Sequence, residues 1–307
     1  GLRTVHYVSP TVWAWRQRRV RKIRRAADRV LCLFPFEPAF YQGHGVHAVF
    51  VGHPMADSIP ADDDPAAARE KLGLEPEAPT IALLPGSRLS EVQRLAAPMI
   101  EAAALLARRR PGLQFVAAMA DDTIAARIRE MLDKTGDVRV HLVQRDATAV
   151  MAAADVVLCA SGTATLETML VNRPMVMTYK ISPASYRLAS MLRLVRLKHF
   201  SLPNILAGEA LVPELIQDEA TGPALASAAE RWLDDVAGRD DLRRRFIELR
   251  AQLECDASGR AAAVVAELLE HKCAKGSQGW TRPAAARWPG RWWSPPSSST
   301  RCDRSRA

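Results

Sequence analysis

Two short loops in this chain combine small, hydroxyl-bearing and charged residues at spacings suited to binding phosphate. The first lies in the segment Thr80–Val92 (TIALLPGSRLSEV), where an apolar run ends at Gly86 and then Ser87 and Arg88 lead into a helical pattern. A strand, a tight turn and a helix in this order present free backbone N–H groups and the positive end of a helix dipole beside an arginine. A phosphate group is the ligand that such a loop favours. The alternative is an ordinary strand–helix connection with a solvated Arg88.

The second loop, Ala160–Glu167 (ASGTATLE), also follows an apolar run and opens a helical pattern. Hydroxyl groups in it can donate to phosphate oxygens, and the carboxylate of Glu167 can accept two hydrogen bonds from the vicinal diol of a ribose. The candidate ligand-binding residues besides Glu167 are Ser161, Gly162, Thr163 and Thr165. The alternative is that Thr163 or Thr165 caps the helix and Glu167 complements its dipole. Two such loops in one sheet favour a nucleotide over an isolated phosphate.

The elements around these loops alternate between strand and helix patterns. We predict strands at residues 81–84, 114–118, 138–142, 156–159 and 175–178, and helices at 65–72, 91–109, 123–134, 147–154 and 165–171. This alternation predicts an α/β fold with a doubly wound parallel sheet, which binds ligands at the carboxyl ends of its strands. Further helices are predicted at 223–236, 242–253 and 261–269.

The first 55 residues carry a separate pattern. Strands are predicted at 5–8, 28–34 and 48–51, a basic helix begins near Arg18, and a short helix covers 37–42. A parallel strand needs neighbours, so we expect further sequence before Gly1. The predicted division is a partial N-terminal domain at 1–55, a second domain at 56–255 that begins with a linker at 56–66, a closing helix at 256–272, and a disordered basic tail rich in Trp, Pro and Ser at 273–307.

The composition excludes several classes of function. The chain has 307 residues, 48% of them hydrophobic, and a net charge of +8. The tail holds seven cations and one acid, so the remainder is close to neutral and does not favour nucleic-acid binding. Five cysteines without a CxxC pair indicate a reducing compartment rather than a disulfide framework or a metal site. No apolar stretch is long enough to cross a bilayer. The cationic amphipathic segment 179–200 is typical of a lipid-surface contact or of packing on its own core.

Six segments in order support a family resemblance. They are VHYVSPTVWAWR (Val5–Arg16), FPFE (Phe34–Glu37), FVGHPMAD (Phe50–Asp57), LLPGSR with EV (Leu83–Val92), ASGTATLE (Ala160–Glu167) and SLPNILAGE (Ser201–Glu209). With these segments the chain resembles the lipid-A-disaccharide synthase family over residues 3–270.

The resemblance implies a GT-B fold of two Rossmann-like domains, the C-terminal one complete here and the N-terminal one present as a remnant. It implies an inverting, metal-independent glycosyltransferase of lipid A and lipopolysaccharide biosynthesis that needs no cofactor. Such an enzyme transfers 2,3-diacylglucosamine from its UDP carrier to 2,3-diacylglucosamine 1-phosphate, forms the β(1→6) disaccharide and releases UDP. The implied location is cytoplasmic, peripheral on the inner membrane, without nucleic-acid partners; a homodimer is compatible with the sequence.

The resemblance also assigns roles to residues. Arg88, with Gly86 and Ser87, would bind the diphosphate, Glu167 the ribose, and residues 161–165 the phosphate or ribose edge. Asn204 would give a supporting polar contact. The residues expected to line the cleft from the N-terminal part are Ser9, Trp13, Trp15 and Arg16.

No general base is assigned. An inverting transfer needs one, and the resemblance places the expected carboxylate in an N-terminal region that precedes this sequence, so we expect the chain as given to be catalytically impaired. His53 is interpreted as a structural histidine after a strand.

Two alternatives remain open from the sequence. One is another UDP-GlcNAc-type GT-B enzyme, either the transferase that completes the peptidoglycan lipid intermediate or an epimerase, although VSPTVWAWR does not belong to their patterns. The other is a non-catalytic UDP-binding fragment.

Overall fold

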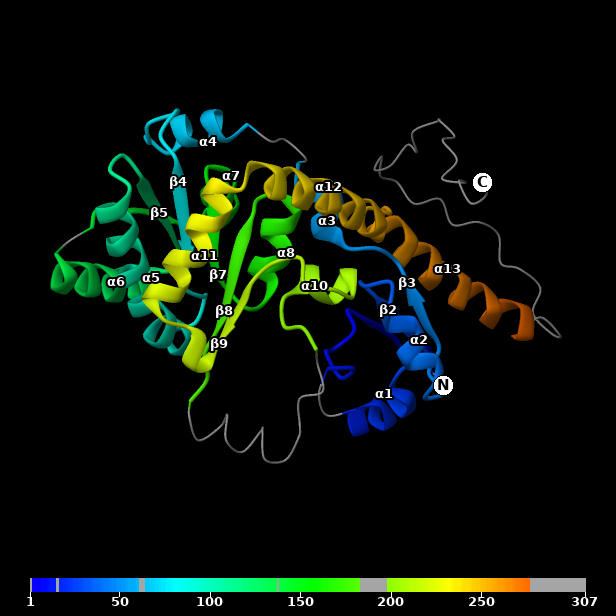
Figure 1. The fold of residues 1–307 in the computed structure, drawn as a ribbon. Helices are drawn as coiled ribbons and strands as arrows, with labels where there is room; N and C mark the ends of the chain where they lie inside the picture. The colour runs from blue at the N-terminus through cyan, green and yellow to red at the C-terminus, as the bar shows by residue number, and fades with distance from the viewer. Residues whose placement is uncertain (1, 15–16, 61–63, 137, 183–197, 277–307) are drawn as a thin grey trace.

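The computed structural model describes residues 2–14, 17–60, 64–136, 138–182 and 198–276, which fold around two parallel β-sheets (Figure 1). The smaller sheet has the order β1-β2-β3, with strands Val5–Tyr7, Arg29–Cys32 and Ala48–Phe50. The larger has the order β6-β5-β4-β7-β8-β9. Its strands are β4 (Thr80–Leu84), β5 (Gln114–Met119), β6 (His141–Gln144), β7 (Val156–Ala160), β8 (Met175–Tyr179) and β9 (Glu214–Ile216). The predicted α/β fold with a doubly wound parallel sheet is confirmed.

The larger sheet is covered by helices on both faces because its central strands are apolar on both sides. In β4, Ile81 and Leu83 pack in the cluster that contains α5, α6 and α11, whereas Ala82 and Leu84 pack in the cluster that contains α7, α8 and α12. These helices are α5 (Leu89–Arg109), α6 (Asp122–Thr135), α11 (Gly222–Asp234), α7 (Ala147–Ala152), α8 (Thr163–Leu170) and α12 (Val236–Leu253). The alternation of side chains along β4 thus fixes which helices lie on which face.

The smaller sheet has its own core. Val20, Val30 and Tyr41 are buried in it. Its surrounding elements are η1 (Gln17–Arg19), α1 (Val20–Ala26) and α2 (Glu37–Gln42). All three strands are parallel, as the apolar pattern predicted.

The two sheets are joined by the segment after β3 and by the last helix. The carboxylate of Asp57, in α3 (Pro54–Ser58), accepts hydrogen bonds from the backbone N–H groups of Cys255, Asp256 and Ala257 at 3.0, 3.1 and 2.7 Å. Gly52 has φ +95°, and a Cβ there would lie 2.8 Å from Cβ of Cys255. Helix α13 (Ala257–Gly276) then returns to the smaller sheet, as Figure 1 shows, and packs against Leu31 and Leu33.

Some predicted boundaries were wrong. The predicted linker at 56–66 begins inside α3, where Ala56 is fully buried. Its last two residues are the first two of α4 (Pro65–Lys71). The strand predicted at 138–142 is β6 at His141–Gln144, because Val138 and Val140 pack on the core before pairing begins opposite Val116. The short edge strand β9 was not predicted. Two short elements near it are α10 (Leu202–Ala207) and η2 (Gln217–Glu219).

The predictions for the C-terminal part and for the amphipathic segment have different outcomes. The closing helix predicted at 256–272 is α13, which extends to Gly276. Residues 277–307 of the predicted tail and residues 183–197 of the amphipathic segment lie outside the described residues. None of the described helices is both long and apolar enough to cross a membrane.

Candidate functional site

A cavity of about 420 Å³ opens at the carboxyl ends of the central strands of the larger sheet. It lies between the loops that follow β4 and β7, where the strand order reverses and the connections run to opposite faces. Doubly wound sheets bind ligands at such a point. Seven of the predicted ligand-binding residues line this cavity: Gly86, Ser87, Arg88, Ser161, Gly162, Thr163 and Glu167.

The loop after β4 is shaped by Gly86. Its φ is +123°, in the left-handed region, and a Cβ at this position would lie 2.6 Å from Oε2 of Glu91 and 2.7 Å from its Cβ. Only glycine fits both constraints. Arg88 is the N-cap residue of α5, and its guanidinium donates from Nη1 to Oε1 of Glu91 at 2.8 Å. The loop therefore presents an exposed cation and the N-terminus of a 21-residue helix to the cavity.

The loop after β7 begins α8 at Thr163, with Gly162 as its N-cap at φ +140°. Glu167 is half-buried and lines the cavity. Burial raises the pKa of the Glu167 carboxyl above its usual value, and a hydrogen bond with Thr163 partly opposes this shift. A half-buried carboxylate beside hydroxyl groups can accept hydrogen bonds from a diol.

Two predicted residues lie outside the cavity wall. Thr165 is fully buried; its Oγ1 donates to the Gly162 carbonyl at 2.8 Å and accepts from the Leu202 N–H at 3.2 Å. Asn204 is also fully buried. Its Nδ2 donates to Oε1 of Glu214 and its Oδ1 accepts from the N–H of Val212, at 2.8 and 2.9 Å.

These buried contacts support the second loop. Oε1 of Glu214 also accepts from the Ser201 N–H at 2.8 Å, which fixes the chain at the start of α10. Ser161 Oγ in turn donates to the Phe200 carbonyl at 3.2 Å. The structure thus gives Asn204 a place behind the loop, where it holds the segment against which Ser161 and Thr165 are positioned.

Of the predicted cleft residues of the N-terminal part, the two that the structure describes, Ser9 and Trp13, do not line this cavity. Ser9 Oγ lies 3.0 Å from the Tyr41 hydroxyl, and Trp13 Nε1 donates to Oε1 of Glu37 at 3.0 Å. Burial raises the pKa of the Glu37 carboxyl, while hydrogen bonds from its neighbours oppose the rise. Trp15 and Arg16 lie outside the described residues.

His53 has a structural contact that agrees with its interpretation. Its Nδ1 accepts from the Met55 N–H at 3.2 Å and so caps α3. Burial lowers the pKa of its imidazole, which favours the neutral form that this contact requires.

Sequence reasoning missed part of the wall. Glu91 and Arg145 add a carboxylate and a second cation, and apolar surface comes from residues at the end of β5, directly after it and in α7. These apolar residues include Met119, Ala120, Ala147 and Met151. Arg145 has φ +58° and directly follows β6, and Asp146 accepts from the Ala149 N–H at 2.9 Å as the N-cap of α7. Asp146, as a residue type that favours the N-cap of a helix, could have indicated that Arg145 lies in the loop between β6 and α7. The strand was predicted at 138–142, too early in the chain, so this loop was not recognised.

The cavity therefore has three kinds of surface. They are the Gly86–Arg88 loop, the carboxylate of Glu167, and a largely apolar wall that also includes Arg145. This set of surfaces suits the phosphates, the sugar and the base of a nucleotide. Among the described residues, no three His, Cys, Asp or Glu side chains cluster in a way that could hold a metal ion.

Comparisons with known proteins are consistent across sequence and structure. The family model described as "Lipid-A-disaccharide synthetase" matches residues 1–265. The chain is 48% identical over 273 residues to a lipid-A-disaccharide synthase of Xylella fastidiosa (strain M12), covering 88% of this chain and 71% of that protein. It is 49% identical over 277 residues to that of Xanthomonas campestris pv. campestris (strain 8004), covering 89% of this chain and 63% of that protein.

Solved structures resemble the fold at low sequence identity. An S. aureus MnaA–UDP structure matches with a TM-score of 0.53 and 14% identity, over 81% of this chain and 63% of that one. A sucrose-phosphate synthase from Thermosynechococcus elongatus matches with a TM-score of 0.51 and 19% identity, over 85% and 63%. At these identities the likeness concerns the fold alone, which is GT-B-like.

Proposed function

The chain belongs to the lipid-A-disaccharide synthetase family, and from this premise we propose that its 420 Å³ cavity binds the UDP-sugar donor of a glycosyltransferase that forms the lipid A disaccharide. The observation that carries the proposal is the convergence of the loops after β4 and β7 on one cavity at the switch point of the sheet. The donor is UDP-2,3-diacylglucosamine and the acceptor 2,3-diacylglucosamine 1-phosphate.

The cavity would orient the nucleotide along its length. The diphosphate would lie on the Gly86–Arg88 loop, where backbone N–H groups and the Arg88 guanidinium face it. Glu167 would accept hydrogen bonds from the ribose diol, and the uracil ring would lie on the apolar surface near Met119 and Met151. In this orientation the sugar, which is joined to the β-phosphate, would extend beyond the Gly86–Arg88 loop and away from the base.

The same loop would also assist the reaction. As the bond between the sugar and the β-phosphate breaks, negative charge develops on the leaving diphosphate. The N-terminus of α5 and the Arg88 guanidinium would stabilise that charge. Their contribution would therefore be larger in the transition state than in the bound donor.

We further propose that the protein works at the cytoplasmic face of the inner membrane, because both substrates carry acyl chains. Support comes from η1 and α1, whose cationic side chains are exposed and would be attracted to anionic lipid. These residues are Arg18, Arg19, Arg21, Lys22, Arg24 and Arg25.

The direct test is titration of UDP, uridine and ADP into the purified chain by calorimetry. We expect UDP to bind more tightly than either of the others, since it alone satisfies the base, ribose and diphosphate surfaces together. A chain that does not bind UDP, or that binds ADP equally well, would contradict the assignment of the cavity. Release of UDP in the presence of both lipid substrates would separate a transferase from a binding protein.

A further inference from the structure

We propose that Glu91 is a positioning residue that stands in for the donor diphosphate: it holds Arg88 in the empty site and releases the guanidinium when the diphosphate enters. This inference rests on the proposed function, since it names a partner of Arg88 within the same site. Glu91 was not among the residues predicted from the sequence.

The ion pair is asymmetric. Arg88 Nη1 lies 2.8 Å from Oε1 of Glu91, and both residues line the cavity. The Arg88 side chain is 77% exposed, whereas that of Glu91 is 28% exposed. The carboxylate is therefore the fixed member of the pair, and the guanidinium is the member that can change partners.

The loop itself holds the carboxylate in place. Glu91 packs across Gly86 so closely that a Cβ on residue 86 would lie 2.6 Å from Oε2. The missing side chain of Gly86 thus leaves room for the carboxylate beneath the phosphate loop. The negative charge of Glu91 is also felt by Tyr179 at the end of β8, whose pKa is raised by burial and then by Glu91.

A carboxylate at this place has an electrostatic consequence. Carboxylates and phosphates both accept hydrogen bonds from arginine, so the two anions compete for one guanidinium. Two anions in one partly buried site also repel each other. Glu91 should therefore keep Arg88 oriented in the empty site and weaken the hold on UDP, which has to leave after each transfer.

The place of Glu91 in the cavity wall, and not its spacing from Arg88, distinguishes it from a structural helix residue. A glutamate in the first turn of a helix complements the dipole wherever its carboxylate points. Helix α6 provides the comparison, because Arg127 Nη1 contacts Oε2 of Glu130 at 2.6 Å with the same three-residue spacing. That pair does not line the cavity.

The test compares UDP and uridine binding by the unsubstituted chain and by Glu91→Gln. Glutamine keeps the size of the side chain and can still accept a hydrogen bond from Arg88, so only the charge changes. We expect Glu91→Gln to bind UDP about tenfold more tightly and uridine equally well, which corresponds to loss of one repulsive contact at partial exposure. The matched control Glu130→Gln should change neither affinity.

The double variant Arg88→Ala/Glu91→Gln should gain much less affinity, relative to Arg88→Ala, than the single variant gains relative to the unsubstituted chain. Equal or weaker UDP binding by folded Glu91→Gln, or an equal gain for uridine, would overturn the inference while the proposed function stands. Failure of the unsubstituted chain to bind UDP would overturn both. Thermal unfolding of each variant establishes that it is folded.

Discussion

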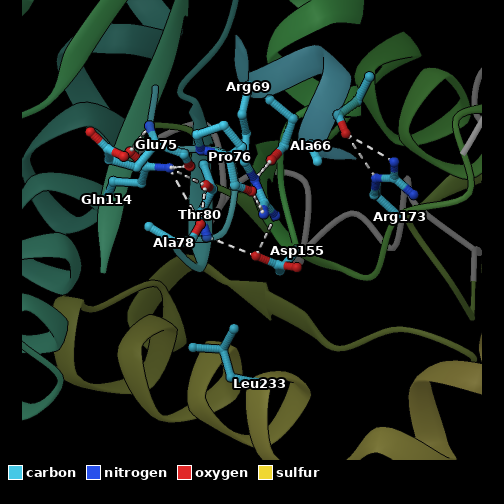
Figure 2. A network of polar contacts seen from close by, with 12 residues as sticks. Ala66, Arg69, Glu75, Pro76, Ala78, Thr80, Gln114, Asp155, Arg173 and Leu233 are labelled. Atoms are coloured by element: carbon cyan, nitrogen blue, oxygen red, sulfur yellow. Dashed lines mark hydrogen bonds and ion pairs between the residues drawn. The ribbon is translucent and has the colours of Figure 1, made fainter. Parts of the chain in front are cut away.

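Arg69 and Asp155 form an ion pair (Figure 2). The pair lies at the amino ends of β4 and β7, whereas the cavity lies at their carboxyl ends. Arg69 Nη2 lies 2.8 Å from Oδ2 of Asp155, and the same oxygen accepts from the Thr80 N–H at 2.7 Å. Arg69 also donates from Nε to the Ala153 carbonyl and from Nη1 to the Pro76 carbonyl, at 2.9 and 2.7 Å. The Arg69 side chain thus joins α4 to the segments that precede β4 and β7.

Substitution of Arg69 should therefore destabilise the fold strongly, although Arg69 does not line the cavity. Because the Arg69 side chain is only 7% exposed, Arg69→Ala removes a buried partner and leaves acceptors unsatisfied. We expect it to lower the free energy of unfolding by about 3 kcal/mol. The control Lys134→Ala, which breaks an exposed pair with Glu130, should cost less than about 1 kcal/mol. Urea unfolding measures both, and equal losses would contradict the account.

Gly86→Ala should damage the site more than the fold. The added Cβ meets Glu91 and the residue has φ +123°, so the loop has to move. We expect UDP affinity to fall at least about tenfold, which is about 1.4 kcal/mol. Gly112→Ala is the matched control, since Gly112 has φ +97° but open space around it and does not line the cavity. Its expected effect is a loss of stability with unchanged UDP affinity.

Glu167→Gln should have opposite effects on binding and on stability. If Glu167 accepts from the ribose diol, the unsubstituted chain should prefer UDP to its 2′-deoxy analogue, and the variant should lose most of that preference, about tenfold. Competition binding with the two nucleotides measures this. An equal preference for UDP over the 2′-deoxy analogue before and after substitution would contradict a role of Glu167 in ribose binding.

The stability effect follows from the raised pKa of Glu167. Burial disfavours the ionised carboxyl in the folded state, so the penalty is fully present above the folded pKa. The penalty disappears as the pH falls from the pKa of Glu167 in the folded state toward its pKa in the unfolded chain. Glu167→Gln should therefore raise the melting temperature at neutral pH, with a gap that closes in acid. A difference in melting temperature that widens on acidification would contradict a raised pKa of Glu167 in the folded state.

The sequence was sufficient for features in which local pattern and chemistry coincide. The loops at Gly86–Arg88 and Ser161–Glu167 were predicted because an apolar strand, a glycine and a helix start lie next to each other in the chain. The doubly wound fold followed from the same alternation. The six-stranded order and the return of α13 to the smaller sheet depend on long-range contacts, such as those of Asp57 with residues 255–257.

What could not be predicted depends on distant or subtle contacts. The family resemblance assigned Asn204 a supporting polar contact in the ligand site, but its partners Val212 and Glu214 are brought to it only when β9 adds to the sheet. Arg145 was missed because β6 begins three residues later than its valine pattern indicates. Glu91 was overlooked because its spacing from Arg88 is equally typical of an exposed helical ion pair.

The central claim is that Arg88 and its loop bind the diphosphate of a UDP-sugar. The most direct measurement is the dissociation constant of UDP for the unsubstituted chain and for Arg88→Ala, with Arg127→Ala as a control arginine on α6. We predict that Arg88→Ala weakens UDP binding by about 10- to 100-fold, as expected for loss of a charge-assisted contact to phosphate, and leaves uridine binding unchanged. Unchanged UDP affinity in folded Arg88→Ala would contradict the account.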